Sequence, residues 1–356
     1  MMHVFPVLFL GGSLFLSTLS ADPIADKLGD IFEKVMEQSH RDGAKVMRRP
    51  VFAKDHGCLQ AEFLVNPKLD PALRVGAFKE DRYPAWVRFS NDGGYGKDTR
   101  KSARGMAIKL VGVPGRKILK GEEAAVTQDF VMENYPVFFA DNAKEFLEFI
   151  EVALSGDDKK QADFDKAHPE TPKILKKMDE MLLADPLDGQ YWTPTPYRLG
   201  DKIMKYMVKP CIDPPSPPVK PMKRENFLRE NLIEHMKEKT PVCLRLYVQL
   251  QTSPTTTDRA TVAWSEKGDG AYRAFGDLTI ATGQDVDSDV RKQICENLSF
   301  TGWHATKDLE PVGSINEARG IIYQRMAKAR RKFNAQSDEK ILQGEPTELK
   351  LEGVKK

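Results

Sequence analysis

The sequence lacks the features that define several large functional classes. It has only four cysteines, and none of them belongs to a CxxC pair, which argues against a zinc site. Lysine and arginine total 54 against 52 aspartate and glutamate residues, so no excess of charge points to nucleic acid or to an anionic membrane. Internal repeats and long low-complexity segments are also missing. A chain of 356 residues that is 40% hydrophobic therefore indicates an ordinary globular protein.

The sequence also has no apolar run long enough to cross a bilayer. The longest run extends from about Val4 to Leu16, and small polar residues follow it. This pattern predicts a signal peptide over residues 1–21, cleaved after Ser20 or after Ala21. An uncleaved anchor is the alternative. On the first interpretation the protein is secreted or periplasmic, and it is not stably inserted in a membrane after cleavage.

Export would permit disulfide bonds, because these bonds persist in oxidising compartments. The four cysteines, Cys58, Cys211, Cys243 and Cys295, allow three pairings, and the sequence does not choose among them. Cys58 and Cys243 lie in strand-like stretches, so buried thiols are the alternative interpretation.

Hydrophobic periodicity predicts an α+β protein. Helical spacing predicts helices over residues 25–38, 142–154, 225–239, 287–298 and 314–333. Alternating or short apolar runs predict strands over residues 58–65, 85–90, 105–113, 135–140, 243–251, 260–264 and 275–281. So many alternating strands in one domain could close into a barrel.

Other local signals mark the ends of elements and the domain organisation. The proline-rich segment 209–223 predicts an extended connector within one domain spanning residues 22–337. Ser314 and Glu317 have the spacing of a capping box, which predicts the start of the last helix. The basic run 328–332 lacks an accompanying aromatic platform, so it indicates a solvated helix end rather than a nucleic-acid site. Residues 338–356 form a polar tail.

Three separated segments together resemble the haem catalase superfamily, and in particular its short members. They are "WVRFSNDGGYGKDTRKSARGMAIKL" (86–110), "NYPVFFADNAKEFLEFI" (134–150) and the segment 297–334, which contains Arg-x-x-x-Tyr. The resemblance covers most of residues 45–335, without the C-terminal domain of full-size catalases. It implies a catalase-type antiparallel β-barrel with helices packed around it, and haem between the barrel and the C-terminal helix.

The third segment carries the residue that the resemblance implies as the iron ligand. Arg319 and Tyr323 stand four residues apart on a predicted helix, so their side chains meet. A nearby guanidinium stabilises the phenolate form in which a tyrosine binds ferric iron, and tyrosine is the axial haem ligand of catalase. The resemblance therefore implies that Tyr323 ligates the iron of haem b. Ordinary surface packing of the two side chains is the alternative.

The same resemblance implies a set of haem contacts in the first two segments. Arg88 corresponds to the arginine that pairs with a haem propionate, and Phe138 and Phe146 correspond to aromatic residues that wall the haem. Arg319 would lie near a propionate as well. The alternative is a surface ion pair for Arg88 and a plain hydrophobic core for the two phenylalanines.

The resemblance also implies which residues face bound peroxide. Ser90 corresponds to the serine that hydrogen-bonds the distal base. Asn134 resembles the distal asparagine that holds peroxide, although in full-length catalases that asparagine stands one residue earlier, where this chain has Glu133. In "FAKDHG", Phe52 occupies the slot of the distal histidine. Phenylalanine cannot transfer a proton, so the sequence predicts weakened activity.

His56 stands four residues after Phe52 and is the nearest candidate to replace the missing base. In an extended segment it would lie about 13 Å further along, at roughly 3.3 Å per residue, so a solvent-facing turn is the favoured interpretation. Four functions remain open. They are a slow peroxide-consuming catalase or peroxidase, a non-catalytic haem carrier or sensor, an enzyme that transforms organic or lipid hydroperoxides, and a haem-free structural relative.

Overall fold

The computed structural model describes residues 23–41, 46–92, 94, 96–212, 224–253 and 258–334. The predicted signal peptide, the polar tail and most of the proline-rich connector therefore lie outside the described residues. Within the described part of the chain, no helix has both the length and the apolar character needed to cross a membrane.

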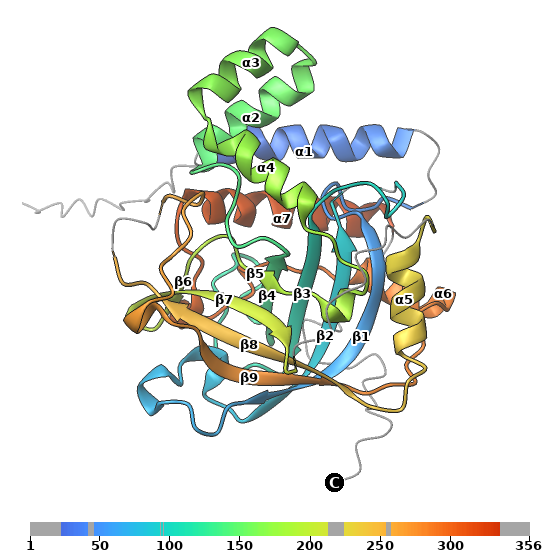
Figure 1. Ribbon diagram of the computed structural model, residues 1–356, viewed down its shortest axis with the longest axis vertical. Coiled ribbons are helices and arrows are strands. Elements are labelled where there is room, and N and C mark those ends of the chain that lie inside the picture. The colour runs from blue at the N-terminus through green and yellow to red at the C-terminus, as the bar shows by residue number, and fades with distance from the viewer. Residues whose placement is uncertain are drawn as a thin grey trace, which may run out of the picture.

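Eight antiparallel strands close into a barrel (Figure 1), in the order β5-β4-β3-β2-β1-β9-β8-β7, with β7 pairing back onto β5 and β6 extending from β7. The strands are β1 (Lys54–Val65), β2 (Arg82–Asn91), β3 (Arg104–Val111), β4 (Thr127–Glu133), β5 (Tyr191–Trp192), β6 (Tyr197–Leu199), β7 (Lys202–Pro210), β8 (Val242–Leu250) and β9 (Arg273–Ile280). The prediction of an α+β fold built on an antiparallel barrel is confirmed.

The barrel interior is filled by large apolar side chains that alternate along the strands. Phe78, from a short turn after β1, contacts Phe275 with ring centroids 5.0 Å apart, and Phe130 contacts Tyr206 at 5.1 Å. All four side chains are buried. Aromatic pairs in edge-to-face contact stabilise a core by about 0.5–1.5 kcal/mol beyond their area burial, so this cluster makes the interior a packed core rather than a channel.

The outer face of β2 and β3 is buried as well, which explains why these strands show a weaker polar–apolar alternation than β8. Every residue of β3 is buried, and so are the last seven residues of β2. A strand covered on both faces needs other elements packed against its outside. The residues that point outward from these strands therefore face protein rather than bulk water.

Helices supply that cover. They are α1 (Pro23–Arg41), α2 (Ala143–Ser155), α3 (Asp158–Ala167), α4 (Glu170–Glu180), α5 (Phe227–His235), α6 (Asp289–Asn297) and α7 (Ser314–Phe333). In Figure 1, α7 lies above the strands, α1 packs along α7, α2 and α3 extend beyond α1, and α4 runs back past α7 toward the strands. The helices α5 and α6 flank β1. Single 3-10 turns occur at Pro71–Leu73, Gly76–Phe78, Pro186–Asp188, Gly268–Gly270 and Lys307–Leu309.

All four cysteines form disulfides, so the alternative of buried thiols for Cys58 and Cys243 is wrong. Cys58 of β1 pairs with Cys295 of α6, and Cys211, after β7, pairs with Cys243 of β8. The first bond joins positions 237 residues apart and fastens α6 to the barrel wall. The second joins two adjacent strands at their ends.

Two predicted strands are absent. Residues 135–140 and 260–264 form turns instead, and they lie against each other. Phe138 N donates to Ala260 O at 3.0 Å, and Ala260 N donates to Asp141 O at 3.1 Å. Two backbone hydrogen bonds are too few to form a ladder, and the apolar residues of these runs pack locally instead.

The predictions for the two ends of α7 need correction. Gly313 is the N-cap, and the Ser314 hydroxyl does not cap its own helix. It accepts from Ala143 N, at the start of α2, at 3.2 Å, and Asp258 Oδ1, from a distant loop, accepts from Ser314 N at 3.0 Å. At the other end Arg330 is buried, although the basic run predicted a solvated helix end. Its guanidinium lies 3.5 Å from the Glu296 carboxylate of α6.

A buried charge cluster joins β3 and β4 to the loop before α7. Lys109 contacts Asp129 at 2.7 Å, and His304 bridges Asp129 at 2.9 Å and Glu122 at 2.5 Å. Burial and Lys109 lower the pKa of His304, but the two carboxylates outweigh them, and the net effect raises it. Arg331 of α7 also pairs with Glu122, at 3.1 Å.

Candidate functional site

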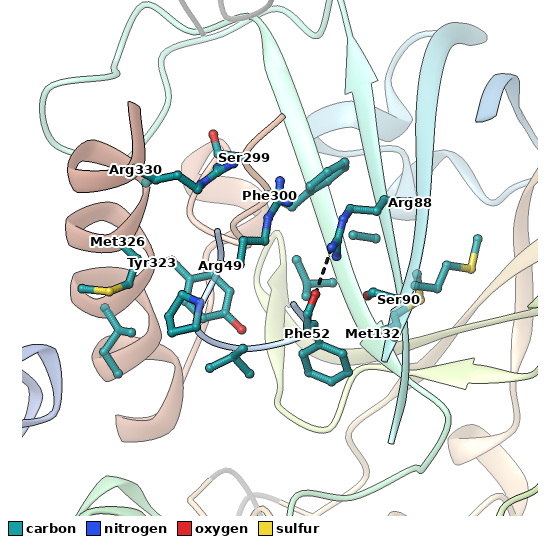
Figure 2. A pocket seen from close by; sticks show the side chains of 18 residues that line it. Arg49, Phe52, Arg88, Ser90, Met132, Ser299, Phe300, Tyr323, Met326 and Arg330 are labelled. Atoms are coloured by element: carbon teal, nitrogen blue, oxygen red, sulfur yellow. Dashed lines mark hydrogen bonds between the residues drawn. The ribbon is translucent and has the colours of Figure 1, made fainter. Parts of the chain in front are cut away.

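A pocket lies between the outer face of the barrel and α7 (Figure 2). Its cavity volume is about 100 Å³, which is below the roughly 300–1,000 Å³ of typical small-molecule sites. Its walls come from the segment before β1, from β2, β3 and β4, from the loop before α7 and from α7 itself. The lining residues are Arg49, Pro50, Val51, Phe52, Arg88, Ser90, Gly105, Met106, Ala107, Val131, Met132, Ser299, Phe300, Ile322, Tyr323, Met326, Ala327 and Arg330.

Strand register builds the barrel wall of this pocket. Across β2, β3 and β4, Arg88 pairs with Ala107, which pairs with Val131. The next row on the same face consists of Ser90, Gly105 and Glu133. Directly opposed residues in an antiparallel sheet point to the same side, so these two rows form one surface facing α7.

Phe52 covers the second row. A Cβ at Gly105 would lie 2.6 Å from Cδ1 of the Phe52 ring and 2.9 Å from Ser90 Oγ, so the ring lies directly on the glycine. Phe52 has a φ of 49°, and it is the one non-glycine residue with positive φ in the described part of the chain. Arg88 Nη2 donates to Phe52 O at 2.9 Å, and Asp92 Oδ1 accepts from Phe52 N at 3.3 Å. The sheet therefore holds Phe52 in a conformation that costs on the order of 1–3 kcal/mol.

Tyr323 lines the opposite wall, on α7, and Arg319 of the same helix is bonded to it. Arg319 Nε donates to the Tyr323 hydroxyl at 3.3 Å, and the guanidinium carbon lies 5.2 Å from the ring centroid. Arg319 Nη1 also donates to Thr195 Oγ1 at 3.0 Å and to Asn316 Oδ1 at 3.2 Å, which fixes its orientation. Burial opposes the charge of Arg319, but attraction to the Tyr323 phenol and to two further tyrosines raises the pKa of Arg319.

The other predicted site residues lie outside the pocket lining. Phe138 and Phe146 contact each other with centroids 5.3 Å apart, and Phe146 packs in the same cluster as Tyr323. Asn134 Oδ1 accepts from Arg104 N at 2.7 Å, which links the ends of β3 and β4. Of the eight predicted site residues, the pocket therefore brings together Phe52, Arg88, Ser90 and Tyr323, with Arg319 bonded to Tyr323.

The location of His56 differs from the predicted solvent-facing turn. It lies in β1, it is 1% exposed, and it is not among the pocket-lining residues. Burial lowers the pKa of His56 well below the usual value, and the nearby charges of Arg104 and Lys54 lower it further. The strand begins earlier than predicted, and it takes His56 into the protein with it.

Sequence reasoning missed two arginines that line the pocket, Arg49 and Arg330. Both guanidinium groups lie 3.5 Å from the Glu296 carboxylate, and both donate to the carbonyl of Leu298. Arg330 stands seven residues after Tyr323, so it lies on the same face of α7. This spacing was a signal in the sequence that could have found Arg330, whereas Arg49 becomes visible only through the fold.

The lining chemistry fits a haem. A haem is a flat apolar ring with two carboxylates, and the pocket combines apolar side chains with three guanidinium groups, those of Arg49, Arg88 and Arg330. The Tyr323 phenol adds an oxygen donor on one wall. Tyr323 and Arg319 would hold the iron side, and the arginines would hold the carboxylates.

Comparison with known proteins supports the fold at the level of structure only. No protein-family model and no curated protein matches the chain by sequence. A fungal catalase superimposes with a TM-score of 0.63 and 17% identity over 87% of this chain. Catalase A from Saccharomyces cerevisiae gives 0.62 and 17% over 87%, and a bacterial catalase gives 0.63 and 17% over 89%.

The fold class is thus an α+β barrel with helices on its outer face. More particularly, the chain has a catalase-like fold, since its structural neighbours are catalases. The chain spans just under two thirds of the length of these solved chains, between 63% and 65%.

Proposed function

We propose that this protein is a short member of the haem catalase superfamily that binds haem b and consumes peroxide slowly, as a weak catalase or peroxidase. The observation that carries the proposal is the pocket between the barrel wall and α7, with Tyr323 and its bonded Arg319 facing Arg88 and Ser90. The catalase-like fold supports the same conclusion. Hydrogen peroxide or an organic hydroperoxide is the proposed substrate.

The roles of the residues follow from their chemistry. Bound haem would supply the redox chemistry that cleaves and oxidises peroxide. Tyr323 binds the iron through its phenol oxygen, and Arg319 favours the phenolate by donating to that oxygen. Arg88 pairs with a carboxylate of the haem while keeping its bond to Phe52 O. Ser90 offers a hydroxyl near the Phe52 ring.

Phe52 is the reason for the slow reaction. A positioned acid–base side chain typically contributes roughly 10²–10⁴-fold to the rate, and a phenyl ring contributes nothing to proton transfer. Its ring also covers Gly105 and shields that part of the wall from water. The weakened activity therefore comes from a missing proton carrier rather than from a missing pocket.

The apolar lining favours a second candidate function. Val51, Phe52, Met132 and Ile322 all line the pocket, and such walls suit the hydrocarbon part of an organic hydroperoxide. A non-catalytic haem carrier is the outcome if no peroxide reacts. Export is part of the proposal as well, and the two disulfides support it because these bonds persist in oxidising compartments.

The test compares the mature chain, expressed with a haem supply, with Phe52→His, Tyr323→Phe and the control Tyr247→Phe. Tyr247 is half-buried on β8 and does not line the pocket. The expected result is a phenolate-type ferric absorption spectrum that only Tyr323→Phe loses. Oxygen release from hydrogen peroxide should rise roughly 10²–10⁴-fold in Phe52→His.

Each alternative has a distinct outcome in the same experiment. Fast oxygen release by the wild type would contradict the account of Phe52. Consumption of a lipid hydroperoxide without reaction of hydrogen peroxide would select the second candidate function. A chain that binds no haem would refute the proposal and leave a structural relative of catalases.

A further inference from the structure

Lys205 of β7 is a buried cation that the proposed function does not use. It is 5% exposed, and its Nζ has no hydrogen-bond partner among the described residues. Burial alone lowers the pKa of Lys205, so no described carboxylate lies close enough to offset its charge. Buried polar atoms are nearly always hydrogen-bonded and buried charges are nearly always paired, so this amine needs an explanation.

The amine lies on the outer face of the barrel, under a loop. The two residues beside Lys205 along β7 belong to the barrel core, so the side chain between them points outward. Gln249 of β8 is directly opposite Lys205, and its Nε2 donates to the carbonyls of Ser265 at 3.0 Å and Gly270 at 2.9 Å. These bonds hold the loop 264–270 against the outer face of β7 and β8.

A second donor without an acceptor belongs to the same loop. Lys205 Nζ lies 5.2 Å from the centroid of the Trp264 ring, and Trp264 Nε1 is also buried without a hydrogen-bond partner among the residues that the structure describes. A ring face attracts a cation much more weakly than burial penalises it, so the ring alone does not balance the charge. Both donors therefore need an acceptor.

The amine keeps its charge near neutral pH. Burial lowers the pKa of Lys205 to about 8, so at pH 7 the protonated form still exceeds the neutral amine by about ten to one. The charged and titratable side chains described in the covering segment do not balance it. Glu266 and Lys267 are exposed, and Tyr272 bonds to Trp192. The acceptor that suits this amine is therefore an anion.

We propose that Lys205 and Trp264 form a binding site for one small monovalent anion such as chloride. The two unpartnered buried donors under one loop carry this inference. The ion has to be small because the loop covers the amine, and one negative charge balances one ammonium group. The site does not depend on the proposed haem function, because neither β7 nor β8 contributes a residue to the pocket lining.

The cover over this site is thin enough for an ion to exchange. Trp264 is only partly buried, and Ser265 is exposed, so about one layer of residues separates the amine from solvent. Local opening of a surface loop costs much less than global unfolding. Exchange of the ion therefore requires movement of the loop and not of the barrel.

Urea unfolding of the mature chain tests the site, with chloride replaced stepwise by the larger anion gluconate at constant ionic strength. An ion that binds only the folded chain stabilises it, so above the Kd each tenfold increase in chloride should raise the folding equilibrium constant about tenfold. This dependence should be present at pH 6. It should disappear at pH 10.5, where the folded chain carries a neutral amine at Lys205.

Three variants assign the effect to this site. Lys205→Met should abolish the chloride dependence, whereas the control Lys202→Met should keep it. Lys202 is an exposed lysine of the same strand, and its amine lies 3.3 Å from the Asp201 carboxylate. Trp264→Phe keeps a ring but removes the N–H donor, so it should shift the dependence to higher chloride. The gain in stability from Lys205→Met should be largest in gluconate, where no small anion offsets the charge.

The second readout is tryptophan fluorescence with bromide in place of chloride, because bromide quenches a tryptophan that it contacts. Part of the emission should be quenched with saturation in the wild type and in Lys202→Met, but not in Lys205→Met or Trp264→Phe. Equal chloride dependence in Lys205→Met, or none in the wild type at pH 6, would overturn the proposal. None of these measurements needs bound haem, so a failure of the haem proposal leaves them unchanged.

Discussion

Replacing Gly105 by alanine tests the geometry on which the account of Phe52 depends. The new methyl carbon would stand 2.6 Å from Cδ1 and 2.8 Å from Cε1 of the Phe52 ring. Carbon atoms in favourable contact are about 3.5–4.0 Å apart, so the ring has to move by about 1 Å. The φ angle of Gly105 is not in the left-handed region, so the alanine backbone itself is not strained.

The loss of stability expected from Gly105→Ala depends on how far Phe52 can move. Its carbonyl is held by Arg88 and its amide by Asp92, so the shift must come from side-chain rotation or from a broken hydrogen bond. Overpacking of this kind costs about 1–3 kcal/mol. The loss of glycine entropy in the unfolded chain returns about 0.4–1 kcal/mol. Gly105→Ala should therefore lower the free energy of unfolding by about 1–2 kcal/mol.

A double-mutant cycle with Phe52→Ala separates the clash from other effects. Urea unfolding of the wild type, both single variants and the double variant gives the four free energies that the cycle needs. In the Phe52→Ala background, Gly105→Ala should cost less, because only the contact with Ser90 Oγ at 2.9 Å remains, which gives a coupling energy of about 1–3 kcal/mol. Equal costs of Gly105→Ala in both backgrounds would show that the ring does not lie on Gly105.

Three further predictions concern stability. Replacing Cys58 and Cys295 together by alanine opens a loop of 237 residues and should cost on the order of 5 kcal/mol in urea unfolding; a loss under 1 kcal/mol would contradict the pairing. Because the pKa of His304 is raised, its contribution is complete below the unfolded value of 6.5 and is lost as pH rises through the folded value. Unfolding midpoints measured from pH 5 to 9 should show this loss in the wild type and not in His304→Gln. Lys205 is buried over Trp264, and burial lowers the pKa of its amine to about 8. Lys205→Met should therefore stabilise the protein by on the order of 3 kcal/mol near pH 7, and should give no such gain above pH 10.5. Equal effects at both pH values would refute this prediction.

The sequence predicted most elements of the fold because their signals are local. The strand containing Leu244, Leu246 and Val248 alternates along one half-buried face, and the structure has β8 there. The apolar run 135–140 failed as a strand because apolar content alone does not provide a hydrogen-bonding partner. Its neighbour, the run from Ala260, is too short and too bent to pair with it for more than two bonds.

Some contacts of the candidate site could likewise be predicted from the sequence, and others could not. Arg319 and Tyr323 are one helical turn apart, so the sequence alone indicated that they meet, and Arg319 Nε bonds the phenol oxygen. Arg49 is about 250 residues from the α6 carbonyls that hold it, and no local pattern announces such a contact. The two contacts differ in sequence separation. A periodic pattern shows which residues of one helix lie together, but it does not show which other element packs against that helix.

The sequence by itself indicated five of the helices (α1, α2, α5, α6 and α7) and five of the strands (β1, β2, β3, β8 and β9), but not α3, α4 or β4 to β7. It also showed where Phe52 stands and that Arg319 and Tyr323 share a helix face. Tertiary structure decided the pairing of the cysteines, the burial of Arg330 and His56, and the row of Ser90, Gly105 and Glu133. Strand register decides the row and the side to which His56 points, since a shift of one residue in a strand would turn the side chains of that strand to the other side of the sheet. The packing of α7 against α6 decides the burial of Arg330. Only the closed barrel sets that register.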